Sequence, residues 1–147
     1  MRPHIEELSE KAAPDLLETE IPLAVVGAHL RGQPLNAQLT DLGGRFVRAT
    51  HTAADYRLYA LAETLPAKPG LVRVAAGTGA AIEVEIWTLP RTAFGSFFAQ
   101  IKAPLGLGTL LLEDGQTTAG FLCEAVAITS ARDITAFGGW RAFLAAR

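Results

Sequence analysis

The sequence predicts an α+β fold, with a small mixed, barrel-like β-sheet of about six to seven strands and a few short helices. Two observations carry this expectation. Short apolar runs alternate with Gly- and Pro-rich turns along most of the 147 residues, as they do in proteins built from many short strands. Half of the residues are hydrophobic, which is enough for one core without disulfide or metal support.

The first strand is expected over residues 21–27, which are apolar on both faces and therefore belong in the centre of a sheet or in a closed barrel. A polar loop follows over 32–44, with room for a short helical turn at 38–42. Turn signals such as Pro69-Gly70 separate the next strands. These strands are expected at residues 45–51, 56–61 and 71–75.

Residues 82–87, with the sequence IEVEIW, give the cleanest strand pattern in the chain. Ile82, Val84 and Ile86 alternate with polar positions and are expected to face the core. Glu83 and Glu85 share the opposite face, where two carboxylates could support acid–base chemistry. Exposed glutamate is much the commoner case on such a strand, so we expect this face to be solvated.

The second half of the chain adds two short helices and a hairpin. A helix is expected over residues 90–100, because Pro90 suits a first turn and Ala93, Phe94, Phe97 and Phe98 form an apolar stripe. The turn Glu113-Asp114-Gly115 joins strands at 110–112 and 116–128. Glu124 in that second strand is either exposed or buried with a partner. Trp140 opens a short amphipathic helix after a glycine pair.

Residues 1–20 differ from the rest and are interpreted as an acidic arm or linker before a domain at 21–147. The arm holds six acidic and two basic side chains and little to bury, although the net charge of the whole chain is only −2. Such a segment is either frayed or docked on another subunit.

Composition excludes several classes of function. The arginines are too few for a nucleic-acid surface, and no apolar run reaches the ~18 residues of a membrane span. The N-terminus lacks the apolar core of a signal peptide, so a cytoplasmic location is expected. Cys123 is expected to be a buried structural thiol. The three histidines have no metal-ligand spacing, and we expect neither a metal nor another cofactor.

The end of the first strand, Gly27-Ala28-His29, is the candidate site. Backbone N–H groups at a strand end can bind an anion, and an imidazole exchanges protons near neutral pH. Arginines cluster nearby and suit a small carboxylate ligand. Spacing alone favours the plainer interpretation, in which a core strand ends in a turn and His29 is merely hydrogen-bonded.

Six motifs in order change this balance: VVGAHL (25–30), QPLN (33–36), LGGRFVR (42–48), YRLY (56–59), KPGLVR (68–73) and DITAFGGWR (133–141). Over residues 21–144 they resemble the C-terminal domain of allophanate hydrolase, here without its amidase domain. That domain in turn is similar to the γ-glutamyl cyclotransferase fold, in which the loop after the first strand binds carboxylate. Cyclotransferases also have a catalytic glutamate at a helix end, where this chain reads FFAQIK (97–102) with no acid.

The resemblance implies that this domain speeds the loss of carbon dioxide from N-carboxycarbamate in urea and allophanate breakdown, with His29 as proton donor. A separate amidase would supply that substrate. The alternative is a non-catalytic partner that binds and stabilises such an amidase, with the acidic arm as docking segment. A homodimer is left open. The candidate substrate-binding residues are Gly27, Ala28, Leu30, Asn36, Gln38, Arg45, Arg48, Arg57, Tyr56, Tyr59 and Glu124.

Overall fold

The computed structural model describes residues 19–147 and confirms the α+β fold. The strands are β1 (Glu20–Val25), β2 (Arg45–His51), β3 (Tyr56–Ala60), β4 (Pro69–Arg73), β5 (Glu83–Pro90), β6 (Leu105–Leu111), β7 (Thr117–Cys123) and β8 (Arg132–Asp133). The α-helices are α2 (Ala37–Thr40), α3 (Arg91–Ala99) and α4 (Trp140–Ala146), and the 3-10 helices are η1 (Ala125–Ser130) and η2 (Thr135–Phe137). The acidic arm lies outside the described residues up to residue 18, and Glu20 begins β1.

The strands form two sheets. The larger has the order β2-β5-β1-β7-β6, in which β1 runs antiparallel to β5 and parallel to β7, so this sheet is mixed as predicted. Its central position explains why β1 is apolar on both faces. The smaller sheet has the order β4-β3-β8. Within residues 19–147 the sheets do not close into one barrel, so the barrel-like part of the expectation is not observed.

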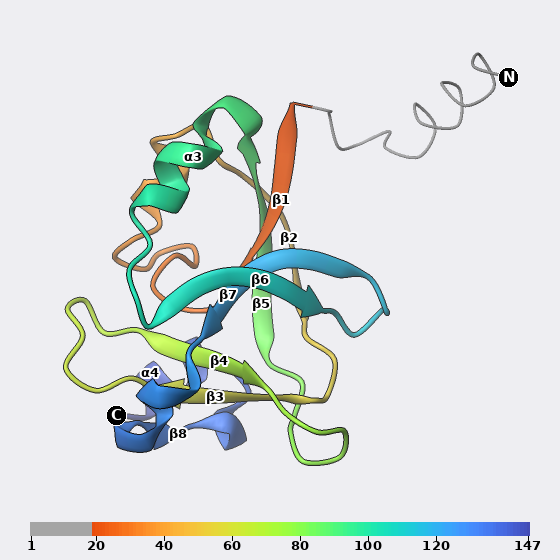
Figure 1. The fold of residues 1–147 in the computed structure, drawn as a ribbon, viewed down its shortest axis with the longest axis vertical. Helices are drawn as coiled ribbons and strands as arrows, with labels where there is room; N and C mark the ends of the chain where they lie inside the picture. The colour runs from red at the N-terminus through yellow and green to blue at the C-terminus, as the bar shows by residue number, and fades with distance from the viewer. Residues whose placement is uncertain (1–18) are drawn as a thin grey trace, which may run out of the picture.

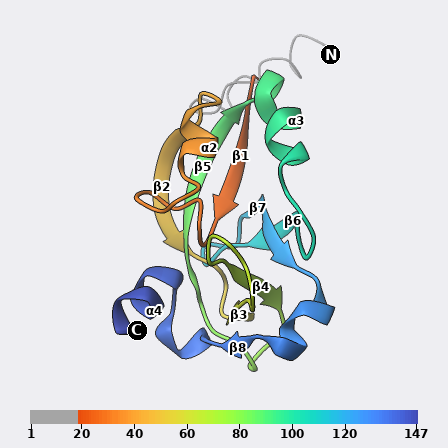
Figure 2. The ribbon, with the colours of Figure 1, turned by 90° about the vertical axis from the view of Figure 1, so that its left-hand side faces the viewer.

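The two sheets follow one another along the long axis of the molecule, with β6 and β7 of the larger sheet next to the smaller sheet (Figures 1 and 2). In Figures 1 and 2, β1, β2 and β5 stand in the upper half with α2 and α3, and the smaller sheet lies below with α4. The sheets meet where β4 packs beside β7. A Cβ on Gly70 of β4 would lie 2.7 Å from Sγ of Cys123 on β7, so glycine permits this close approach. The Cys123 thiol is half-buried at this junction.

One hydrophobic core runs through both sheets. Tyr56 of β3 is fully buried, and its hydroxyl accepts a hydrogen bond from the N–H of Leu111 on β6 at 2.9 Å. The two sheets are therefore joined by a polar contact as well as by apolar packing. Further fully buried members of this core are Leu23, Val25, Leu30, Leu39, Leu58, Ile82, Val84, Leu89, Phe97 and Ile134.

The structure departs from the sequence-based expectation at β5 and after β7. Glu85 was expected on a solvated face, but its exposed fraction is 0%, and only Glu83 is partly exposed. The expectation was wrong because that face of β5 is covered by the residues that follow β1 and by α4. The second hairpin strand ends at Cys123 rather than at 128, and η1 follows. No helix in residues 19–147 is both long and apolar enough to cross a membrane.

Adjacent phenylalanines on α3 offer a matched test of this packing. Phe97 is fully buried, whereas 57% of Phe98 is exposed, although the helical pattern had assigned both to the apolar stripe. We predict that Phe97→Ala lowers the free energy of unfolding by about 3–5 kcal/mol, because it removes a ring from the core. Phe98→Ala should change it by less than about 0.5 kcal/mol. Urea unfolding of both variants measures the difference, and equal losses would contradict the packing of α3.

Candidate functional site

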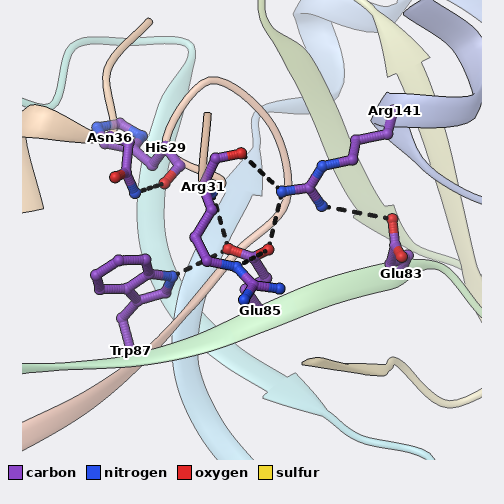
Figure 3. Close-up of polar contacts among 7 residues, drawn as sticks. All are labelled: His29, Arg31, Asn36, Glu83, Glu85, Trp87 and Arg141. Carbon is purple, nitrogen blue, oxygen red and sulfur yellow. Dashed lines mark hydrogen bonds and ion pairs between the residues drawn. The ribbon is translucent and has the colours of Figure 1, made fainter. Parts of the chain in front are cut away.

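The loop that follows β1 carries His29, and hydrogen bonds to its carbonyl groups fix its shape. Leu30 N–H donates to the carbonyl of Gly27 at 3.0 Å, and Leu35 N–H donates to that of Ala28 at 2.8 Å. The side chain of Asn36 donates to the carbonyl of His29 at 2.8 Å (Figure 3). The expected site residue Asn36 therefore acts on the backbone of the loop.

Gly27 is required by a close approach. A Cβ at this position would lie 2.2 Å from Cδ of Pro69, the first residue of β4. The loop of the larger sheet thereby contacts the start of the smaller one.

Three N–H groups of this loop, unlike the carbonyls of the same residues, are not engaged in hydrogen bonds within the described residues. Within residues 19–147, the N–H groups of Gly27, Ala28 and His29 donate no hydrogen bond to another group of the protein. Buried backbone donors normally have a partner. Three successive free donors at a turn are suited to a small anion.

The imidazole of His29 is held between two phenylalanines and an amide. Its ring stacks on Phe121 of β7, with centroids 5.0 Å apart, and meets Phe97 of α3 edge-on at 5.4 Å. Nε2 lies 2.8 Å from Oε1 of Gln38 in α2. With that oxygen as acceptor, Nε2 carries a hydrogen, and Nδ1 is the nitrogen on which a proton is gained or lost.

Burial lowers the pKa of His29 below its ordinary value of 6.5. The hydrogen bond with Gln38 acts in the opposite direction, and the positive charge of Lys68 lowers the pKa further. The ring is therefore neutral at pH 7 in the free protein. An anion bound beside it would favour the protonated form.

Two adjoining pockets open at His29 and share Lys68, Leu105 and Phe121. Their volumes are about 20 Å³ and 40 Å³, which is room for only a few water-sized groups. The first is also lined by Val26, Gly27, Ala28 and Pro69, and the second by Leu35, Gln38, Gln100, Ile101 and Lys102.

The cations at these pockets are lysines, which sequence reasoning missed. Lys68 and Lys102 lie 39 and 73 positions beyond His29, and only the fold brings the three together. The available signal was the position of Lys68 at the start of KPGLVR, one of the recognised motifs. Gln38 was expected at the site and does line the second pocket.

The three expected arginines lie elsewhere and are paired at the surface. Arg45 binds Glu20 at 2.9 Å, Arg48 lies 3.5 Å from Asp114, and Arg57 lies 2.8 Å from Asp133. None of the three lines either His29 pocket. The cationic side chains that line the pockets are therefore lysines and not the arginines expected from the sequence.

The remaining expected residues also lie outside the lining of the two pockets. Leu30 and Tyr56 are fully buried in the core, and Tyr59 is half-buried on β3. Glu124, for which the sequence allowed either exposure or burial with a partner, is exposed just after β7. Among residues 19–147, no group of three or more His, Cys, Asp or Glu side chains is placed to hold a metal ion.

Comparison with known proteins identifies the family of the domain that carries this loop. Residues 21–145 match the family model described as the allophanate hydrolase C-terminal domain. The chain belongs to this family. It is 40% identical over 139 residues to the urea amidolyase of Lachancea kluyveri, covering 92% of this chain.

Solved structures of similar proteins superpose closely on the chain. The allophanate hydrolase of Kluyveromyces lactis superposes with a TM-score of 0.83 at 41% identity, over 86% of this chain and 21% of that one. The uropathogenic E. coli-specific protein c4763 gives a TM-score of 0.79 at 37% identity, over 86% of this chain. The match covers 97% of c4763, so that chain consists almost wholly of this domain. By contrast, the present chain spans only 8% of the length of the Lachancea enzyme.

The cyclotransferase-like fold is confirmed as well. A structure named γ-glutamyl cyclotransferase superposes over 78% of this chain with a TM-score of 0.55, at 10% identity, which is a likeness of fold alone. In this member of the allophanate hydrolase C-terminal family, α3 ends with Gln100 as its C-cap, and Gln100 and Lys102 line the second pocket. Neither pocket is lined by a carboxylate.

The lowered pKa of His29 predicts a dependence of stability on pH. The unfolded chain binds a proton at an ordinary pKa of about 6.5, whereas the folded chain binds it only at lower pH. The unfolded state therefore holds more protons in this window, and folding loses stability as the pH falls from about 6.5 through the folded pKa.

We predict that His29→Gln, which cannot titrate, removes this loss. The difference in unfolding free energy between wild type and variant should shrink from pH 8 to pH 5, measured in urea. His51→Gln is the control, because His51 is an exposed histidine that lines neither pocket. A difference that stays constant with pH would contradict the burial of His29.

Proposed function

We propose that this domain assists the decarboxylation of N-carboxycarbamate, or of a related small N-carboxy compound, with His29 as proton donor. The observation that carries the proposal is the arrangement at one small pocket of the His29 imidazole, three free backbone donors and the Lys68 ammonium group. These are groups that bind a small dianion and move a proton. The family to which the chain belongs supports the same reaction.

The chemistry requires a proton at the substrate nitrogen. As the bond between carbon and nitrogen breaks, its electron pair stays on nitrogen and carbon dioxide leaves. A proton from Nδ1 of His29 to that nitrogen completes the step and gives carbamate. His29 is neutral in the free protein. We infer that the negative charge of the bound substrate raises the pKa of His29, so that the ring takes up the proton that it later donates.

The substrate has two carboxylates, and the proposal assigns a separate set of donors to each. The N–H groups of Gly27, Ala28 and His29 would bind one carboxylate at the first pocket. Lys68, which lines both pockets, and Lys102, which lines the second, would bind the other. The small volume of the pockets favours a substrate of a few heavy atoms.

An amidase is the proposed source of this substrate. The proteins named urea amidolyase and allophanate hydrolase contain the matching domain within much longer chains, of which it covers 8% and 21%. We infer that the domain acts next to an amidase, either in one chain or as a separate partner. Cyclotransferase activity is not part of the proposal, because Gln100 stands at the helix end where a carboxylate would be needed.

We predict that His29→Asn abolishes the acceleration of carbon dioxide loss, because a positioned acid contributes about 10²–10⁴-fold. ¹³C-labelled allophanate and an excess of amidase would generate the substrate, and carbon NMR would follow its decay. The matched control is His51→Asn, since His51 at the end of β2 is exposed, pairs with Glu113 at 3.7 Å and lines neither His29 pocket. An unchanged rate in His29→Asn would overturn the assignment.

Lys68→Met tests the charge of the pocket by two readouts. Removal of the ammonium group should raise the pKa of His29 in NMR titration, since Lys68 lowers it in the wild type. The KM for the dianion should rise about tenfold, as expected for the loss of a charged hydrogen bond. Arg73→Met, which removes an exposed arginine paired with Asp55, is the control. If neither the pKa nor the KM changes, Lys68 does not act on the substrate.

A further inference from the structure

The buried carboxylate of Glu85 lies at the far end of the His29 loop. Its exposed fraction is 0%, and it accepts hydrogen bonds from the N–H and Nε of Arg31, both at 3.0 Å, and from Nε1 of Trp87 at 3.1 Å. Nη2 of Arg141 in α4 donates to it at 2.9 Å. Figure 3 shows these donors converging on Glu85.

This set of donors keeps Glu85 ionised. Burial alone would raise its pKa, but the four hydrogen bonds outweigh burial, and the pKa lies below its ordinary value. A buried charge that is fully bonded in this way holds its partners in fixed positions.

Arg31 is held from three directions. Its backbone N–H and side chain bind Glu85, and its carbonyl accepts a hydrogen bond from Nη2 of Arg141 at 2.8 Å. Its guanidinium also lies 3.7 Å from the ring centroid of Phe46 on β2. Arg31 therefore points away from the pockets, although it stands only two residues after His29.

We propose that Glu85 and Arg141 are positioning residues, which hold the loop 27–31 so that its free N–H groups and the His29 ring face the pocket. The first carbonyls of the loop are fixed by Leu30, Leu35 and Asn36. The hydrogen bonds of its last residue, Arg31, all go to this pair, and the Phe46 ring packs against its guanidinium. Through Arg141, the C-terminal helix α4 would support the site although it lines neither pocket. The inference rests on the proposed function for its catalytic meaning.

The test uses substitutions at the solvent edge of the cluster, where Arg141 is 35% exposed and can be removed without opening the core. Arg141→Met deletes both of its hydrogen bonds, and Arg141→Lys, which has one ammonium group, restores one of them. Glu85→Gln keeps the volume but turns one acceptor into a donor. Arg73→Met is the matched control, because it breaks an arginine–carboxylate pair of 2.8 Å away from the loop.

NMR of the His29 ring gives a readout that does not depend on catalysis. In Arg141→Met we expect the pKa of His29 to rise as its burial loosens, and malonate, a small dicarboxylate probe, to bind about three- to thirtyfold more weakly. Arg141→Lys should lie between this variant and the wild type. Neither the pKa of His29 nor the binding of malonate should change in Arg73→Met.

If the titration of His29 and the binding of malonate are unchanged in a folded Arg141→Met variant, the positioning role is wrong. Should Glu85→Gln fail to fold, the Arg141 series decides alone. Altered titration with no decarboxylation in the wild type would leave the positioning role standing and overturn the proposed function. Decarboxylation that depends on His29 but not on Arg141 would support the proposed function and overturn the positioning role.

Discussion

A buried negative charge in the middle of β5 is the constraint to which much of this structure responds. Burying a carboxylate lowers the stability of the fold unless both of its oxygens accept hydrogen bonds. Glu85 obtains them from a loop, from its own strand and from the C-terminal helix, through Arg31, Trp87 and Arg141. Satisfying one charge thus sets the path of the chain after β1 and the docking position of α4.

The His29 site shows the complementary arrangement, in which donors are left without acceptors. The carbonyls of Gly27, Ala28 and His29 are all bonded within the protein, while their N–H groups have no partner among residues 19–147. Together with Lys68, this leaves an excess of positive potential at a pocket too small for a large ligand. Such preorganised donors are a recurring means of stabilising negative charge.

Much of the fold could be predicted from the sequence, and the misses at Glu85 and at the lysines of the site share one cause. The run 21–27 and the helix 90–100 depend on local patterns, and both occur close to their expected positions. Alternation also predicted which face of β5 carries Glu85, but it could not show that a distant helix covers that face. Similarly, His29 was identified from its strand end and motif, whereas Lys68 and Lys102 reach it only through tertiary structure. Contacts between distant segments are what a local pattern does not contain.

The contact between Gly27 and Pro69 has a consequence for how the molecule opens. It places the pocket on the seam between the two sheets, with His29 and Phe121 from the larger one and Lys68 and Pro69 from the segment that starts the smaller one. A ligand bound there would link both halves. Binding stabilises whichever state holds the ligand, so occupancy would slow hydrogen exchange in β4 as well as in β1 and make the two sheets unfold as a single cooperative unit.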